Sequence, residues 1–155
     1  MANTREEEVI RKLRERATGG ALSGVDVSYS VTGGAPGEHV FDEELRVSGT
    51  GPVHARLRTV GASLQESSEQ LAEPELKTLL LEISEGVGEL IPRSEARFVP
   101  DSVVGQVSVR VDNQEASFFF LPDPGQATQH RKVTREKAVR LVGVLEGLHK
   151  RIIPR

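Results

Sequence analysis

The stretch "VDVSYSVTGGAPGEHVFDEELRVSG", residues 25–49, decides the fold. Its first part, residues 25–31, alternates strictly between apolar and polar side chains, which is the pattern of a strand with one buried face. After a glycine-rich segment the alternation returns through Phe41, Leu45 and Val47, with Glu43 as an exception. Two such segments joined by a short connection predict an antiparallel pair of strands.

The segment between them, "TGGAPG" at residues 32–37, permits three interpretations: a phosphate cradle, a recognition loop or a hairpin turn. A phosphate-binding loop needs a Lys-Ser or Lys-Thr pair and a helix after its glycines, and here a strand follows instead. Gly33 and Gly34 permit the positive φ angles of a tight reversal. We therefore predict a turn, and a role in recognition stays open.

The alternation continues beyond this pair. "SGTG" at residues 48–51 predicts a tight turn, and "PVHARLRTV" at residues 52–60 predicts a third strand of a meander. From about residue 62 the period becomes helical, which predicts a short helix before Pro74 and a second helix over about 74–86.

A hairpin and a helix follow. Residues 104–121 predict two strands joined at Asp112–Glu115, with Asn113 suited to positive φ, and the apolar run Phe118–Phe120 belongs to the core rather than to a base-stacking surface. The amphipathic pattern of residues 134–151 predicts the last helix.

At the other end, residues 4–17 predict a helix that Thr4 can cap and that Gly19 and Gly20 end. The order of elements predicts one α+β domain over residues 1–155. Its antiparallel sheet consists of a three-strand meander and a two-strand hairpin, with helices packed on one face and residues 1–20 as a peripheral helix.

The composition narrows the range of possible functions. The 155 residues are 37% hydrophobic and 28% charged, with a formal net charge of −3 and no cysteine. The charge disfavours non-specific nucleic-acid binding, and the lack of cysteine excludes disulfides and thiolate chemistry. The charged start lacks the apolar region of a secretory signal, and no apolar run approaches the ~18 residues of a membrane span. These features predict a cytoplasmic protein without a membrane segment.

The sequence offers little for catalysis. The nearest approach to a metal cluster is His39 with Asp42 and Glu43, which we interpret as a solvated strand end. A GxSxG nucleophile turn does not occur. We therefore predict a protein that is not an enzyme and that needs no metal or cofactor.

The segment "YSVTGGAPG" (29–37) resembles the corresponding segment of emfourin-like proteins, small bacterial domains in which an aromatic-bearing strand runs into Ser or Thr, Gly-Gly, two residues and Gly. The matching positions are Tyr29, Thr32, Gly33, Gly34 and Gly37, and the later hairpin and last helix match in order. Pro36 and the extra hairpin "RVSGTGPVHARL" (46–57) depart from the pattern. The characterised type inhibits thermolysin-like metalloproteases, so the resemblance implies a metalloprotease as partner.

Two classes of function remain. The first is a non-enzymatic protein-binding module that uses exposed loops on a rigid sheet. The second is a small-ligand-binding or enzymatic domain with a site between sheet and helices. An accessory or structural role is the remaining alternative. For the first class the expected contacts lie in two loops, 32–37 and 122–130. The residues predicted to meet the partner are Thr32, Gly33, Gly34, Pro36, Gly37, Asp123 and His130.

Overall fold

A computed structural model of the chain describes residues 4–33, 41–59, 63–93, 104–120 and 136–154. The predicted α+β class is confirmed. In chain order the elements are α1 (Thr4–Thr18), β1 (Val25–Gly33), β2 (Phe41–Ser48), β3 (Pro52–Thr59), β4 (Gln65–Gln70), α2 (Glu73–Gly86), the short 3-10 helix η1 (Val87–Glu89), β5 (Ile91–Pro92), β6 (Val104–Val111), β7 (Gln114–Phe120) and α3 (Glu136–Ile152).

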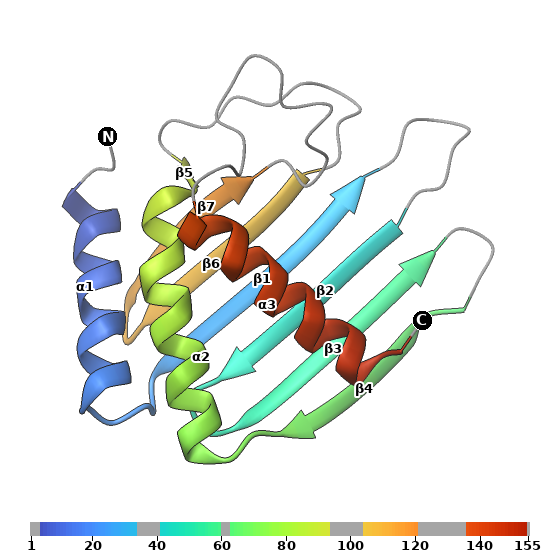
Figure 1. The fold of residues 1–155 in the computed structure, drawn as a ribbon, viewed down its shortest axis with the longest axis horizontal. Coiled ribbons are helices and arrows are strands. Elements are labelled where there is room, and N and C mark those ends of the chain that lie inside the picture. Colours follow the sequence, from blue (N-terminus) through green and yellow to red (C-terminus); the bar gives the residue numbers. More distant parts are fainter. Residues whose placement is uncertain (1–3, 34–40, 60–62, 94–103, 121–135, 155) are drawn as a thin grey trace.

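The strands form one antiparallel sheet in the order β4-β3-β2-β1-β6-β7-β5 (Figure 1). The strand that opens the decisive stretch, β1, lies at the centre. It pairs with β2 from Asp26 to Gly33 and with β6 from Val25 to Thr32. The predicted meander β1-β2-β3 and the predicted hairpin β6-β7 are both confirmed, and β4 and β5 extend the sheet at its two edges.

The short helix predicted between residue 62 and Pro74 is wrong, because this segment contains β4. The sequence of β4, QESSEQ, has no apolar residue, and five of its six side chains are exposed. An edge strand of this kind buries neither face, so it shows no apolar alternation, and its backbone pairing with β3 supplies the stabilisation. The two flanking leucines, Leu64 and Leu71, lie outside the strand.

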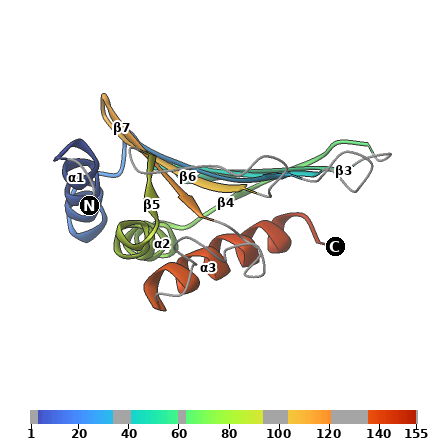
Figure 2. The same ribbon diagram turned by 90° about the horizontal axis from the view of Figure 1, so that it is seen from above.

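All three α-helices cover the same face of the sheet (Figure 2). In this layer α1 packs against α2, β6 and β7, while α3 runs obliquely over the sheet and contacts α2, β2 and β4 (Figure 1). In the described part of the chain no helix lies on the opposite face, which we call the open face. The sheet is therefore amphipathic, as the alternation in β1 predicts.

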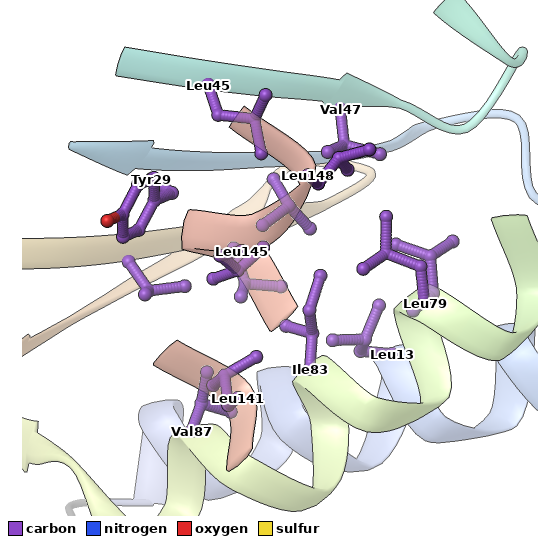
Figure 3. Close-up of a cluster of buried hydrophobic side chains, with 14 of the residues drawn as sticks. Leu13, Tyr29, Leu45, Val47, Leu79, Ile83, Val87, Leu141, Leu145 and Leu148 are labelled. Carbon is purple, nitrogen blue, oxygen red and sulfur yellow. The ribbon is translucent and has the colours of Figure 1, made fainter. Parts of the chain in front are cut away.

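The core fills the space between the sheet and this helix layer (Figure 3). Leu13 of α1, Ile83 of α2 and Leu145 of α3 are fully buried against strand residues such as Leu45. The predicted placement of the run Phe118–Phe120 in the core is confirmed for Phe118 and Phe120, whose rings are buried, but is wrong for Phe119, which alternation directs to the other face and which is only half-buried. The Phe120 ring stacks on Tyr29, with the ring centroids 6.3 Å apart and the planes 11° apart.

The turn of the β6-β7 hairpin anchors α1. Asp112 accepts a hydrogen bond from Arg16 Nη2 at 2.6 Å, and Arg16 Nη1 also donates to the carbonyl oxygen of Ser23 at 2.8 Å. Positive φ falls on Asp112, at 55°, and not on Asn113 as the sequence predicts. Asp tolerates this left-handed conformation nearly as well as Asn, so the turn forms with the positive φ angle one residue earlier than predicted.

Gly105 of β6 gives a direct test of the aromatic packing. A Cβ atom there would lie 2.2 Å from Phe120 Cζ, closer than real contacts allow. We expect Gly105→Ala to lower the free energy of unfolding by about 1–3 kcal/mol, because the Phe120 ring must leave its place against Tyr29. Denaturant unfolding measures this change.

Gly88 provides the matched control, since a Cβ atom there meets nothing within 4 Å. Gly88→Ala should change the free energy of unfolding by less than about 0.5 kcal/mol. Equal losses in the two variants would contradict the proposed packing of Phe120 over Gly105.

Candidate functional site

The sheet topology makes the two predicted recognition loops start at the same side of the sheet. Both β1 and β7 pair antiparallel with β6, so they run parallel to one another and end at the same edge of the sheet. β1 ends at Gly33 and β7 at Phe120, so the segments that follow them both begin at this edge. β3 ends here too, at Thr59, because it runs in the same direction as β1. We call this side of the sheet the loop edge.

Of the residues predicted to contact a partner, Thr32 and Gly33 lie within the described part of the chain, at the end of β1. The Thr32 side chain is exposed. The remaining five predicted contacts lie outside the described residues, and they are Gly34, Pro36, Gly37, Asp123 and His130.

A polar hollow of about 270 Å³ lies beside Thr32 on the open face. The three strands β1, β2 and β3 supply most of its wall, and the segment before β4 supplies one apolar side chain. Its lining residues are Ser30, Thr32, Asp42, Glu43, Glu44, Arg56, Arg58 and Leu64.

This hollow is lined by charged side chains and by one apolar side chain. Arg58 lies opposite Asp42 in the strand register, and both side chains are exposed. Arg56 Nε lies 3.4 Å from Glu66 Oε1, close enough for charge attraction but without an aligned hydrogen bond. Leu64 is 38% exposed at the rim. Arginine is enriched in protein interfaces, and the exposed leucine adds apolar area beside it.

A hydrogen-bonded chain of serine, histidine and glutamate crosses the open face between β3 and β4. His54 Nδ1 lies 2.7 Å from Ser68 Oγ, and His54 Nε2 lies 3.2 Å from Glu66 Oε1. The three side chains belong to cross-strand neighbours, since His54 pairs with Ser68 and Arg56 with Glu66. Such a chain can move a proton from a hydroxyl to an imidazole, although here the His54 side chain is 40% exposed to water.

A second polar cluster is buried between the sheet and α3. His149 of α3 has no exposed surface, and Glu43 of β2 is 5% exposed. The His149 Nε2 nitrogen lies 2.8 Å from the carbonyl oxygen of Arg56, which only accepts, so Nε2 carries a proton, and contact of Nδ1 with Glu43 is attractive when a second proton lies between them, on Nδ1 or on the carboxyl group. Nδ1 then faces Glu43 Oε1 at 3.3 Å, and the Tyr29 hydroxyl donates to Glu43 Oε2 at 3.2 Å. All three side chains of this Tyr29–Glu43–His149 cluster are buried, so the cluster contributes to the packing between the sheet and α3.

Elsewhere the open face carries charges in pairs. Arg110 Nη2 donates to Asp26 Oδ2 at 2.8 Å, and this carboxylate raises the pKa of Arg110 by its hydrogen bond and its charge. Arg46 Nε donates to Glu44 Oε1 at 2.6 Å. These pairs border a shallow concavity of about 660 Å³ whose middle is lined by serines such as Ser28 and Ser108.

Within the described ranges, no group of three or more His, Asp or Glu side chains is arranged to hold a metal ion. The same part of the chain contains no helix that is both long and apolar enough to cross a membrane. A scan against protein-family models and a search of curated proteins gave no match to this chain.

Sequence reasoning missed Arg58 and Leu64 as site residues and Glu43 as a core residue. The first two meet only through strand pairing across loops, and no local pattern shows this. A signal did exist for Glu43, because its charge interrupts the apolar alternation at an inward position. A charged side chain at an inward position predicts a buried polar partner, and the histidines of the chain are candidates for it.

The buried cluster generates a stability test. We expect His149→Leu to lower the free energy of unfolding by about 3–5 kcal/mol, because the Glu43 carboxylate keeps its burial and loses the imidazole. The double variant Glu43→Leu with His149→Leu should recover much of that loss, since no buried charge is then left unmatched. Chemical denaturation of both variants gives the comparison.

His54 serves as the control, because it is a histidine on the open face. His54→Leu should change stability by less than about 0.5 kcal/mol. If the double variant is no more stable than His149→Leu, the pairing of Glu43 with His149 does not account for the loss.

Proposed function

We propose that the chain is a non-enzymatic protein-binding module that meets its partner at the loop edge. The observation that carries the proposal is the convergence at this edge of the ends of β1 and β7 with the hollow beside Thr32. Loops on a rigid sheet position contact groups with little entropic cost on binding. Leu64 supplies an apolar anchor there, and Arg58 supplies a charge that water still solvates.

The resemblance of "YSVTGGAPG" to emfourin-like proteins gives the proposed partner its class, a thermolysin-like metalloprotease. A protease cleft accepts extended segments, and the glycines of residues 32–37 allow the backbone a close approach to it. In this proposal the loop edge enters the cleft.

Inhibition of a thermolysin-type protease tests the proposal. The full chain at micromolar concentration should inhibit cleavage of a peptide substrate. Gly33→Trp and Leu64→Asp should each weaken inhibition by about tenfold or more, since loss of a central contact costs about 1–2 kcal/mol of binding. Circular dichroism should show that both variants remain folded.

Asn113→Trp is the matched control, because the turn of the β6-β7 hairpin lies at the opposite edge of the sheet from Gly33. It should inhibit like the wild-type chain. A protease that stays fully active with the wild-type chain would refute the metalloprotease as partner. Equal losses in Gly33→Trp and Asn113→Trp would refute the loop edge as the binding surface.

A hydrolytic role is the second candidate, and the hydrogen bonds joining Ser68, His54 and Glu66 favour it. In such a reaction Ser68 Oγ would attack an ester carbonyl while its proton passes to His54 Nδ1, and the alcohol would leave with that proton. The exposure of His54 works against this role, because water weakens every electrostatic interaction in the site.

Covalent labelling decides between the two roles. A serine-directed organophosphorus reagent should leave Ser68 unlabelled if the chain only binds proteins, as mass spectrometry of the peptide that contains it would show. Ser108 is an internal reference, because its hydroxyl bonds another hydroxyl, that of Ser117, instead of a histidine. Labelling of Ser68 that His54→Ala abolishes would establish the hydrolytic role instead.

A further inference from the structure

The two outermost strands of the sheet differ in how well they are protected. On one side β5 is two residues long and ends at Pro92, which has no backbone N–H to donate, and α1 packs against the neighbouring strand β7. On the other side lies β4, with six residues and no proline (Figure 1). Among the described residues no strand pairs with the outer side of β4, which we call the free edge.

The backbone groups that point to the free edge belong to alternate residues of β4. The Leu71 N–H donates to the carbonyl oxygen of Gly51 at 2.9 Å, next to the last residue pair of β3 and β4. Hydrogen-bonded and non-hydrogen-bonded pairs alternate along an antiparallel ladder. The N–H and C=O groups of Glu66, Ser68 and Gln70 therefore point away from β3. They form a row of donors and acceptors that matches another extended strand.

The charged side chains of β4 give the free edge little protection. Edge strands often carry charges that discourage pairing with another strand. Here both acids lie beside cations of their own chain. Glu66 Oε1 lies 3.2 Å from His54 Nε2 and 3.4 Å from Arg56 Nε on the open face. Glu69 accepts a hydrogen bond from Arg151 on the face that the helices cover. An incoming strand therefore meets acids whose charge is already offset.

We propose that β4 pairs antiparallel with β4 of a second copy of the chain, so that the two sheets join into one. A two-fold axis perpendicular to the sheet keeps the open faces of both copies on the same side. An axis at Ser68 sets Ser68 opposite Ser68 and Glu66 opposite Gln70, and all six outward groups of each β4 then form hydrogen bonds between the copies. An axis at Ser67 would use only four of these groups.

The side chains of β4 favour a second copy as the partner strand. The sequence of β4 is QESSEQ, and in this register each glutamate lies opposite a neutral hydrogen-bonding group. Glu66 lies opposite the amide of Gln70, and Glu69 lies opposite the hydroxyl of Ser67. No glutamate lies opposite another glutamate, an arrangement that would be destabilising. The inference does not rest on the proposed function, because it uses β4 and not the ends of β1 and β7.

Sedimentation of the full chain tests the dimer. One pair of polar strands makes a small interface, so the average mass should rise with concentration and approach twice the mass of one chain between about 1 μM and about 1 mM. Ser68→Pro should hold the mass at that of one chain, because it removes the N–H at the axis. This N–H points away from β3, so circular dichroism should show that the variant keeps its fold.

Ser68→Ala is the matched control. It loses the hydroxyl contact with His54, as the proline variant does, but it keeps the backbone N–H. It should therefore associate like the wild-type chain.

A charge exchange tests the register. Ser67→Glu should weaken association by about fivefold or more, because it sets glutamate opposite Glu69 of the other copy on both sides of the axis. Combining it with Glu69→Ser should restore association, since each glutamate then lies opposite a serine again.

Amide hydrogen exchange locates the contact. The amides of Glu66, Ser68 and Gln70 should exchange more slowly at high protein concentration, because the second copy bonds them. The amides of Ser67 and Glu69 point to β3 and serve as internal references, and their exchange should not depend on concentration.

Three results would overturn the proposal. The first is a wild-type chain that keeps the mass of one chain at every concentration up to about 1 mM. The second is a dimer that persists unchanged in Ser68→Pro, which would place the contact on another surface. The third is association that leaves the exchange of the Glu66, Ser68 and Gln70 amides unchanged.

Discussion

The contact between Glu43 and His149 is the constraint on which the arrangement of sheet and helices depends. β2 brings a carboxyl group to the buried side of the sheet, where an isolated charge would cost several kcal/mol. The Tyr29 hydroxyl and His149 both contact this carboxyl group, and His149 reaches it from α3 while its other nitrogen contacts the Arg56 carbonyl. This polar cluster therefore adds a directional contact between β2, β3 and α3 to the apolar packing of the core.

The position of α3 has consequences for the whole helix layer. Gly86 at the end of α2 allows close contact with α3, since a Cβ atom there would lie 2.5 Å from Leu141 Cβ. At its other end α3 reaches β4, where Arg151 hydrogen-bonds both Glu69 and Glu75. One helix therefore joins the centre of the sheet, its edge strand and α2.

How far the sequence predicts this fold depends on how each element is stabilised. Elements that bury one side show a periodic pattern of apolar residues in the sequence, and these are β1, β6, β7, α2 and α3. β4 and β5 are held mainly by backbone pairing, and they leave no such pattern. Glu43 is an intermediate case, because its place in an apolar register is visible while its partner, more than a hundred residues away, is not. The hollow at the loop edge is least predictable, since Thr32, Arg58 and Leu64 meet only in the folded sheet.

The charges of the open face indicate where a protein partner would gain most. Arg110 with Asp26 and Arg46 with Glu44 form exposed pairs that are already satisfied by one another and by water. A partner that covered them would have to remove that water and would gain no new pairing in return, so the broad middle of the face is a poor docking surface. Arg58 at the loop edge differs, because it is exposed beside an exposed leucine. Desolvation cost would therefore be lower for a partner that contacts the loop edge than for one that covers the middle of the open face.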